Sequence, residues 1–147
     1  MKTAIVYYSK HHGNTKKLLD AISDKEDVIL IDAVLNPDAD LSGYDLVGFA
    51  SGIYFSKFHK SVLEAAEKLL SGQKVFFMYT YGAKKQGYTK AVREVVEKRN
   101  AKIEGEYGCF GFDTFGPLKF VGGLAKGHPD QEEIKSAVSF FEKISKE

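Results

Sequence analysis

Two short runs of nearly uninterrupted apolar residues place the strongest constraint on the fold of this chain. They read DLVGFA at 45–50 and KVFFMY at 74–79. Strands of a parallel sheet are covered on both faces and show such runs, whereas strands of an antiparallel sandwich alternate apolar with polar residues. Other runs rich in β-branched and aromatic residues stand at 3–8, 27–33 and 106–113. The sequence therefore predicts parallel strands at 3–8, 27–33, 44–50, 74–80 and 106–113.

Segments with helical periodicity separate these strands. Their apolar residues recur every three or four positions, which gives each helix one stripe that can lie on a sheet. The stripes are Leu18, Leu19 and Ile22; Val62, Leu63, Ala66, Leu69 and Leu70; Val92, Val95 and Val96; and Ile134, Val138, Phe141 and Ile144. This alternation predicts an α/β fold with a doubly wound parallel sheet.

Two connections depart from the alternation. Segment 34–43 contains Pro37 and Gly43 and is short for a right-handed crossover, so we expect little more than one helical turn there. The glycine-rich segment 116–127 predicts a surface loop before a helix that begins near Pro129 and Asp130. Because two separate cores would each be close to the lower limit of stability, residues 1–147 are predicted to form one domain.

Composition and charge argue against several classes of function. The 21 Lys and Arg residues nearly balance the 20 Asp and Glu residues, and a net charge of +1 does not favour nucleic acid as a partner. The single cysteine, Cys109, excludes an intramolecular disulfide and favours a cytoplasmic location. We expect no signal peptide and no integral membrane segment, because the apolar runs are too short. His59 and His128 show no spacing to carboxylates that supports a metal site.

The loop at 9–15, which reads SKHHGNT, follows the first predicted strand and precedes a helix. Small and hydroxyl residues with a glycine let backbone N–H groups surround an anion, and a helix N-terminus adds about half a positive charge. Ligands of parallel sheets bind at the carboxyl ends of the strands, where this loop stands. We interpret it as a phosphate-binding loop; an ordinary turn with Asn14 or Thr15 capping the helix is the alternative.

Two more loops at the same edge of the predicted sheet are rich in aromatic residues. Segment 51–58 reads SGIYFSKF, and segment 80–88 reads TYGAKKQGY. A flat ring can stack on such side chains, although a single loop tyrosine more often packs against the next helix. Together, the three loops predict a pocket for a ligand with a phosphate at one end and a flat ring at the other.

The segment from Tyr8 and Ser9 to Thr15 resembles the phosphate loop of the flavodoxin family, and the resemblance extends over essentially the whole chain. It implies a five-stranded parallel sheet in the order 2-1-3-4-5 and flavin mononucleotide (FMN) as the cofactor. Segment 51–60 is also similar to part of the menaquinone-dependent protoporphyrinogen oxidases. The resemblance implies phosphate binding by Ser9, Gly13, Asn14 and Thr15, with His11 and His12 in the same loop, and ring contacts from Ser51, Gly52, Ile53, Tyr54, Thr80, Tyr81, Gly82 and Tyr88.

Two departures from the family pattern stand in these loops. The phosphate loop is one residue longer than the common Ser-x-Thr-Gly-Asn-Thr form, with two histidines in place of a small hydroxyl residue. No Asp or Glu occurs at 51–62 or 80–92, and the basic residues that flank the ring loops are Lys57, His59, Lys60, Lys84 and Lys85. We expect this charge to favour reduced, negatively charged flavin, and hence a potential less negative than in acidic flavodoxins.

The sequence therefore predicts an FMN-dependent electron carrier or small oxidoreductase, with redox proteins or a quinone-like acceptor as partners. A receiver-type signalling domain needs acidic residues after the first and third strands, where Tyr8, Ser9, Ala50 and Ser51 stand instead. A cofactor-free interaction module on the same fold is the remaining alternative. No residue is assigned a catalytic or metal-binding role.

Overall fold

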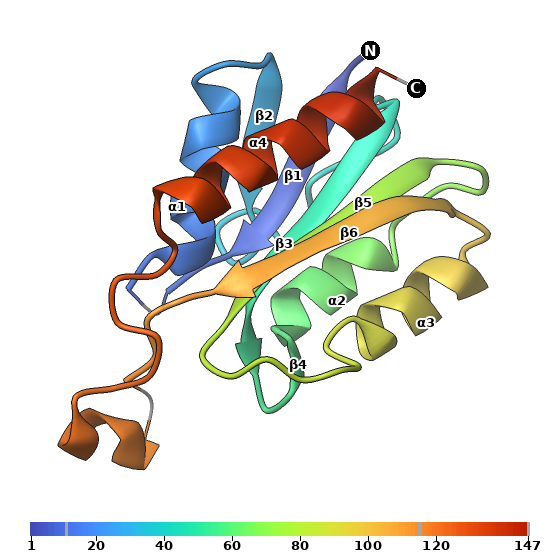
Figure 1. Cartoon of the computed structure of the whole chain (residues 1–147). Helices are drawn as coiled ribbons and strands as arrows, with labels where there is room; N and C mark the ends of the chain where they lie inside the picture. The colour runs from blue at the N-terminus through green and yellow to red at the C-terminus, as the bar shows by residue number, and fades with distance from the viewer. Residues whose placement is uncertain (11, 115, 147) are drawn as a thin grey trace.

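The computed structural model describes residues 1–10, 12–114 and 116–146. A central sheet runs through the molecule, with helices on both faces (Figure 1). Its parallel strands, in spatial order, are β2 (Val28–Asp32), β1 (Thr3–Tyr8), β3 (Leu46–Tyr54), β5 (Lys74–Tyr81) and β6 (Lys102–Phe110). These correspond to the five predicted strands, and their predicted order 2-1-3-4-5 is confirmed.

Helices cover the two faces of this sheet. α1 (Asn14–Ser23) and α4 (Gln131–Ser145) lie side by side on one face, and α2 (Lys60–Ala66) and α3 (Lys90–Lys98) lie on the other (Figure 1). Most residues of the predicted stripes are buried in two cores, one on each face. Leu70 is an exception at 50% exposed, because α2 ends four residues before it. Within the part of the chain that the structure describes, no helix has the length and apolar character needed to cross a membrane.

The segment after β3 forms a hairpin, and its prediction as a loop is wrong. β3 continues to Tyr54, and β4 (Lys57–Phe58) pairs with it in antiparallel orientation. Phe55 and Ser56 make the turn with φ angles of 52° and 65°. Two positive φ angles suit the right-handed twist of hairpin strands, but such turns favour glycine or asparagine. The hairpin therefore holds a phenylalanine in a conformation that its side chain disfavours.

The bounds of the last strand also differ from the prediction. β6 runs from Lys102 to Phe110, not from 106 to 113. It is an edge strand of the sheet and carries Glu104 and Glu106, whose charge hid its first half from a search for apolar runs. The early end of β6 leaves residues 111–113 in a loop at the carboxyl edge of the sheet.

The two unusual connections have short structures. Segment 34–43 contains no helix, and its one bond of the α-helical i→i−4 type runs from Asn36 N to Asp32 O at 3.0 Å. The Asp32 carboxylate accepts the N–H groups of Val34 and Leu35 at 2.9 and 3.1 Å, which fixes a turn instead. Segment 116–127, predicted as a loop, begins with the 3₁₀ helix η1 (Gly116–Val121). This segment projects away from the sheet beyond β6 (Figure 1).

A polar network joins α3 to the sheet at Glu106. The Glu106 carboxylate accepts hydrogen bonds from Tyr79 Oη at 3.0 Å and from Thr89 Oγ1 at 3.0 Å, and it pairs with the Arg93 guanidinium. Partial burial opposes ionisation, but these hydrogen bonds outweigh it and lower the pKa of Glu106. The ionised carboxylate is thus the form that the folded protein prefers.

Glu106→Gln is expected to destabilise the protein by about 1–2 kcal/mol at pH 7, since it replaces hydrogen bonds to a charged group. A carboxyl whose pKa is lowered by folding stabilises the folded state above its unfolded pKa, and this contribution is lost as the pH falls. The difference between wild type and variant should therefore stay constant from pH 7 to about pH 5 and shrink as the pH falls further toward 3. Urea unfolding at each pH measures it. A difference that stays constant down to about pH 3 would contradict a role for the charge.

Candidate functional site

A cavity of about 290 Å³ lies at the carboxyl edge of the sheet. Four segments line it: the loop from β1 into α1, the end of β3 with its hairpin turn, the end of β5, and the loop after β6. The chain leaves β1 and β3 toward opposite faces of the sheet, so this edge is the point where the strand order reverses. Parallel α/β sheets bind ligands at such a point.

The N-terminus of α1 forms one end of the cavity. Gly13 precedes the helix with a φ of 63°, and Lys16 N donates to Ser9 Oγ at 3.0 Å. Thr15 Oγ1 shares a buried hydrogen bond of 2.8 Å with Thr80 Oγ1 at the end of β5. This end thus combines hydroxyl groups with a helix terminus, and the first turn of α1 contains no acidic residue. An anion is the ligand that such a terminus favours.

Asn14 connects this end of the cavity to the loop after β6. The residue is 6% exposed, and its Nδ2 donates to Phe112 O at 2.8 Å. Its Oδ1 is buried and has no hydrogen-bond partner among the described residues. A buried acceptor without a donor is costly, and a hydroxyl-bearing ligand or a water molecule would relieve it. The cavity therefore contains a polar atom suited to a ligand with donor groups.

Aromatic residues form the other end of the cavity. The Tyr54 side chain lies close over Gly52. A Cβ atom built on Gly52 would stand 3.2 Å from the Tyr54 hydroxyl. The Tyr54 ring is held edge-on against Tyr8 at 5.4 Å and against His59 at 5.5 Å between ring centres. Burial, helped by the charge of Lys60, lowers the pKa of His59, so its imidazole is neutral at neutral pH. The cations near this end are therefore lysines, not His59.

The predicted site residues divide into those that line the cavity and those that support it. Ser51 supports it: its Oγ donates to Gly52 O at 2.5 Å and accepts from His59 N at 3.0 Å, which braces the hairpin. Tyr88 is 7% exposed, donates to Ala83 O at 2.6 Å and packs behind Tyr81. The predicted residues that line the cavity are Ser9, Asn14, Thr15, Gly52, Ile53, Tyr54, Thr80, Tyr81 and Gly82.

His12, the described histidine of the phosphate loop, does not line the cavity. His11 lies outside the described residues. His12 is exposed and turned toward the loop after β6: its Nε2 shares a hydrogen bond of 2.8 Å with Thr114 Oγ1, and its ring stacks on Phe112 at 4.5 Å. Gly13 provides the left-handed backbone before α1 and is not itself in the lining. His12 thus joins two loops of the site.

Four of the described lining residues were not among the predicted site residues. Phe55 comes from the unpredicted hairpin, and Gly111, Phe112 and Asp113 come from the loop after β6. Asp113 is the one carboxylate among the described residues that line the cavity, and a Cβ atom on Gly82 would stand 2.7 Å from its Oδ2. The absence of Asp and Glu from segments 51–62 and 80–92 holds, but the loop after β6 adds this carboxylate to the cavity. An earlier predicted end of β6 would have placed residues 111–113 in a loop at this edge of the sheet. The predicted strand instead ended at 113, three residues after the observed end at Phe110.

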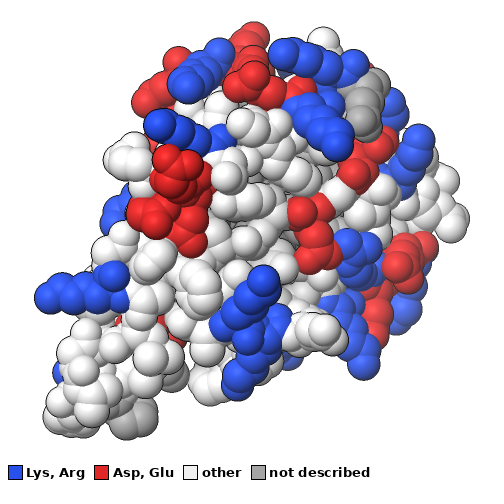
Figure 2. All heavy atoms as spheres, viewed as in Figure 1, with Lys and Arg blue, Asp and Glu red and all other residues white. Residues whose placement is uncertain are grey.

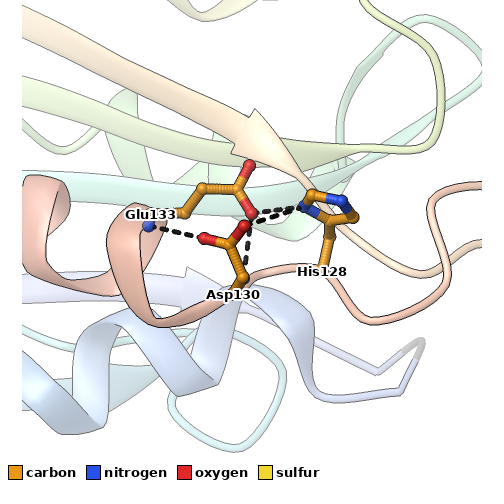
Figure 3. Close-up of side chains that lie close together, drawn as sticks. All are labelled: His128, Asp130 and Glu133. Atoms are coloured by element: carbon orange, nitrogen blue, oxygen red, sulfur yellow. Dashed lines mark hydrogen bonds and ion pairs between the residues drawn. The ribbon is translucent and has the colours of Figure 1, made fainter.

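His128, Asp130 and Glu133 also lie close together, beside the start of α4 (Figure 3). Glu133 Oε1 lies 2.5 Å from His128 Nδ1 and accepts from Asp130 N at 2.9 Å, while Asp130 Oδ1 accepts from Glu133 N at 2.9 Å. The other Glu133 oxygen accepts from Phe110 N at 3.2 Å. The sequence analysis did not predict that these three residues lie together. Asp130 and Glu133 form a capping box at the start of α4, and Glu133 also joins this helix to the end of β6.

The fold and the cavity together define a doubly wound α/β protein with a cavity at its switch point. A family model described as a flavodoxin domain matches residues 5–114. An uncharacterised protein of Methanocaldococcus jannaschii is 38% identical over 151 residues, with 99% of each chain covered. The chain therefore belongs to the flavodoxin family.

Solved structures resemble the fold at lower identity. A flavodoxin from the domain Archaea is 16% identical, with 99% of both chains covered and a TM-score of 0.68. A flavoprotein of Lactobacillus acidophilus in complex with FMN is 19% identical, covers 73% of this chain and 92% of its own, and has a TM-score of 0.54. At these identities the similarity concerns the fold alone.

Proposed function

We propose that this protein binds FMN in the cavity and transfers electrons, as a carrier or a small oxidoreductase. The observation that carries the proposal is the shape of the site, in which an anion-binding helix terminus and a tyrosine-lined end face one cavity. Membership of the flavodoxin family supports it, as does the FMN complex of the structurally similar flavoprotein. A cytoplasmic location stays a prediction.

The residues present fit FMN. Ser9, Thr15 and the N–H groups of the first turn of α1 would hold the phosphate, and Asn14 Oδ1 would accept from a ribityl hydroxyl. Tyr54 and Tyr81 would contact the ring and exclude water from it. FMN, when bound, supplies the electron-transfer chemistry, and the protein's part is to bind, orient and tune it.

Absorption of the purified protein in the flavin range, followed by release and identification of the nucleotide, tests the proposal directly. We expect FMN and not FAD, because one phosphate-binding loop is present. Flavin fluorescence should be strongly quenched on binding and partly restored in Tyr54→Ala, since the tyrosine would lie against the ring. Tyr44→Ala is a matched control far from the cavity. Equal affinity for FMN and FAD, or unquenched fluorescence in the wild type, would contradict the assignment.

The charges around the cavity predict how it tunes a bound flavin. Asp113 lines the cavity, whereas Lys84 and Lys85 are exposed at its rim. A unit charge about 10 Å from the ring contributes on the order of 1–2 kcal/mol at an effective dielectric of about 20, before salt screening. Asp113→Asn should therefore raise the reduction potential, and Lys84→Glu/Lys85→Glu should lower it.

Potentiometric titration at low salt measures these shifts. Glu97→Gln, an exposed change on α3, serves as the charge-matched control for Asp113→Asn. If both variants change the potential equally, Asp113 has no special influence. The wild-type potential should be less negative than those of acidic flavodoxins, in keeping with the lysines at the rim.

A further inference from the structure

Charge is distributed unevenly over a chain that is nearly neutral as a whole. Segments 51–62 and 80–92, which leave β3 and β5 at the cavity, contain five lysines and no Asp or Glu. Segment 24–45, around the edge strand β2, contains seven Asp or Glu residues and one lysine. The protein thus has a positive end at the cavity and a negative edge at β2. Such an asymmetry steers the approach of a charged partner.

The lysines at the cavity are not neutralised by neighbours. Lys57, Lys84 and Lys85 are exposed, and none of them forms an ion pair with any described residue. Lys57 follows the hairpin turn that lines the cavity, and Lys84 and Lys85 follow Gly82, which also lines it. Figure 2 shows Lys and Arg atoms gathered at the lower edge of the molecule, beside a projection on which most atoms belong to uncharged residues. The mouth of the cavity therefore has a positive rim.

One large apolar side chain is exposed at this rim, and two more are exposed on the projecting segment that contains η1. Phe55 lines the cavity and is 86% exposed. Phe120 and Val121, on η1, are 81% and 76% exposed, and Lys119 Nζ lies 5.2 Å from the centre of the Phe120 ring. Protein interfaces combine apolar and aromatic anchors with a polar rim. We name the surface formed by Phe55, Lys57, Lys84 and Lys85 the mouth surface.

The turn at Phe55 is evidence that this side chain has a use beyond folding. Its φ of 52° favours asparagine or glycine, and its exposure means that the ring adds little to the core. A phenylalanine there carries a conformational cost without a matching gain in burial. Costs of this kind concentrate at binding sites.

We propose that the mouth surface docks an acidic redox protein, one that presents carboxylates around its own redox centre. The lysines would steer and orient such a partner, and Phe55 would be buried against it at the mouth of the cavity. This inference rests on the proposed function, because the partner exchanges electrons with the cofactor of the cavity. The proposed partner is negatively charged around its redox centre, whereas a partner that complements an acidic flavodoxin is positively charged.

Binding to two small redox proteins of opposite charge tests the proposal. The probes are a plant-type ferredoxin, which is acidic, and cytochrome c, which is basic. The readout is equilibrium binding to the immobilised protein, with and without FMN, between about 10 and 150 mM salt, over which the Debye length falls from about 30 to about 8 Å. We expect ferredoxin to bind and to be released by salt, and cytochrome c to bind at least about tenfold more weakly.

Two charge-reversal variants locate the surface. Lys84→Glu/Lys85→Glu should weaken ferredoxin binding about tenfold or more at low salt. Lys25→Glu/Lys98→Glu makes the same change in net charge just after α1 and at the last residue of α3, at the edge of the sheet away from the cavity. It should change binding less than about twofold. Equal effects of the two variants, or tighter binding of cytochrome c, would overturn the proposal.

Phe55→Asn separates docking from folding. Asparagine suits the positive φ of the turn, so the variant should unfold at the same or a higher temperature while ferredoxin binds several-fold more weakly. Unchanged ferredoxin binding by Phe55→Asn would contradict the proposed contact between Phe55 and the partner. Self-association of the chain at low salt, abolished by Lys84→Glu/Lys85→Glu, would show that the mouth surface takes the acidic edge of a second copy and would overturn the proposal.

These outcomes are distinguishable from failure of the proposed function. A protein that takes up no flavin but binds ferredoxin through Lys84 and Lys85 would refute FMN binding and retain the docking surface. A protein that holds FMN but binds both probes equally would retain the proposed function and refute the docking surface. Flavin content, measured by absorbance for every variant, assigns each result to one of the two.

Discussion

Replacing Thr15 with alanine is expected to weaken FMN binding about 10- to 100-fold and to change riboflavin binding less than about threefold. The reason is the position of its hydroxyl, which is buried in the first turn of α1 and shares a 2.8 Å hydrogen bond with Thr80. A hydrogen bond to a charged group contributes about 1.5–3 kcal/mol, which corresponds to this range of affinity. Fluorescence titration of flavin-free protein with each flavin measures both constants.

Two further variants keep this result interpretable. Thr15→Ser retains the hydroxyl and should bind FMN nearly as well as the wild type. Gly13→Val should lose FMN as selectively as Thr15→Ala does, because a β-branched residue resists the φ of 63° that begins α1. A loss of riboflavin as large as the loss of FMN would show that the phosphate lies elsewhere.

Much of the fold could be predicted because burial on two faces demands uninterrupted apolar sequence. The strands β3 and β5 lie in the middle of the sheet and match the two apolar runs. The errors are at the margins of the sheet. β6 is an edge strand whose partly solvent-facing side tolerates Glu104, and β4 is two residues long, too short to leave a pattern.

The candidate site could be predicted where it depends on local sequence. The loops after β1, β3 and β5 line the cavity, because the carboxyl ends of parallel strands meet at one edge. The contribution of the loop after β6 depends on contacts across the chain, such as that between Asn14 and Phe112, which no local pattern records. Tyr88 was predicted to contact the ring because it is an aromatic residue in one of these loops. Its side chain instead turns inward, and its hydroxyl donates to Ala83 O.

The core contains one position where glycine is required by a neighbour's ring. Gly48 of β3 is the register partner of Phe76 in β5, and a Cβ atom on Gly48 would stand 2.4 Å from Phe76 Cζ. The Phe76 ring cannot move aside, because it is fully buried and packs against Phe140 and Phe141 with ring centres 6.2 and 5.7 Å away. Gly48→Ala is therefore expected to destabilise the protein by about 2–3 kcal/mol.

Urea unfolding of Gly48→Ala, Phe76→Leu and the double variant tests whether the two positions are coupled. Phe76→Leu alone leaves unfilled space and should cost about 1–3 kcal/mol, but the shorter side chain makes room for the new methyl group. The double variant should therefore be more stable than the sum of the single effects predicts, by about 1–2 kcal/mol. Gly43→Ala is the matched control, since nothing lies within 4 Å of its Cβ position, and it should change stability little. If Gly48→Ala costs no more than Gly43→Ala, the Phe76 ring does not require a glycine in β3.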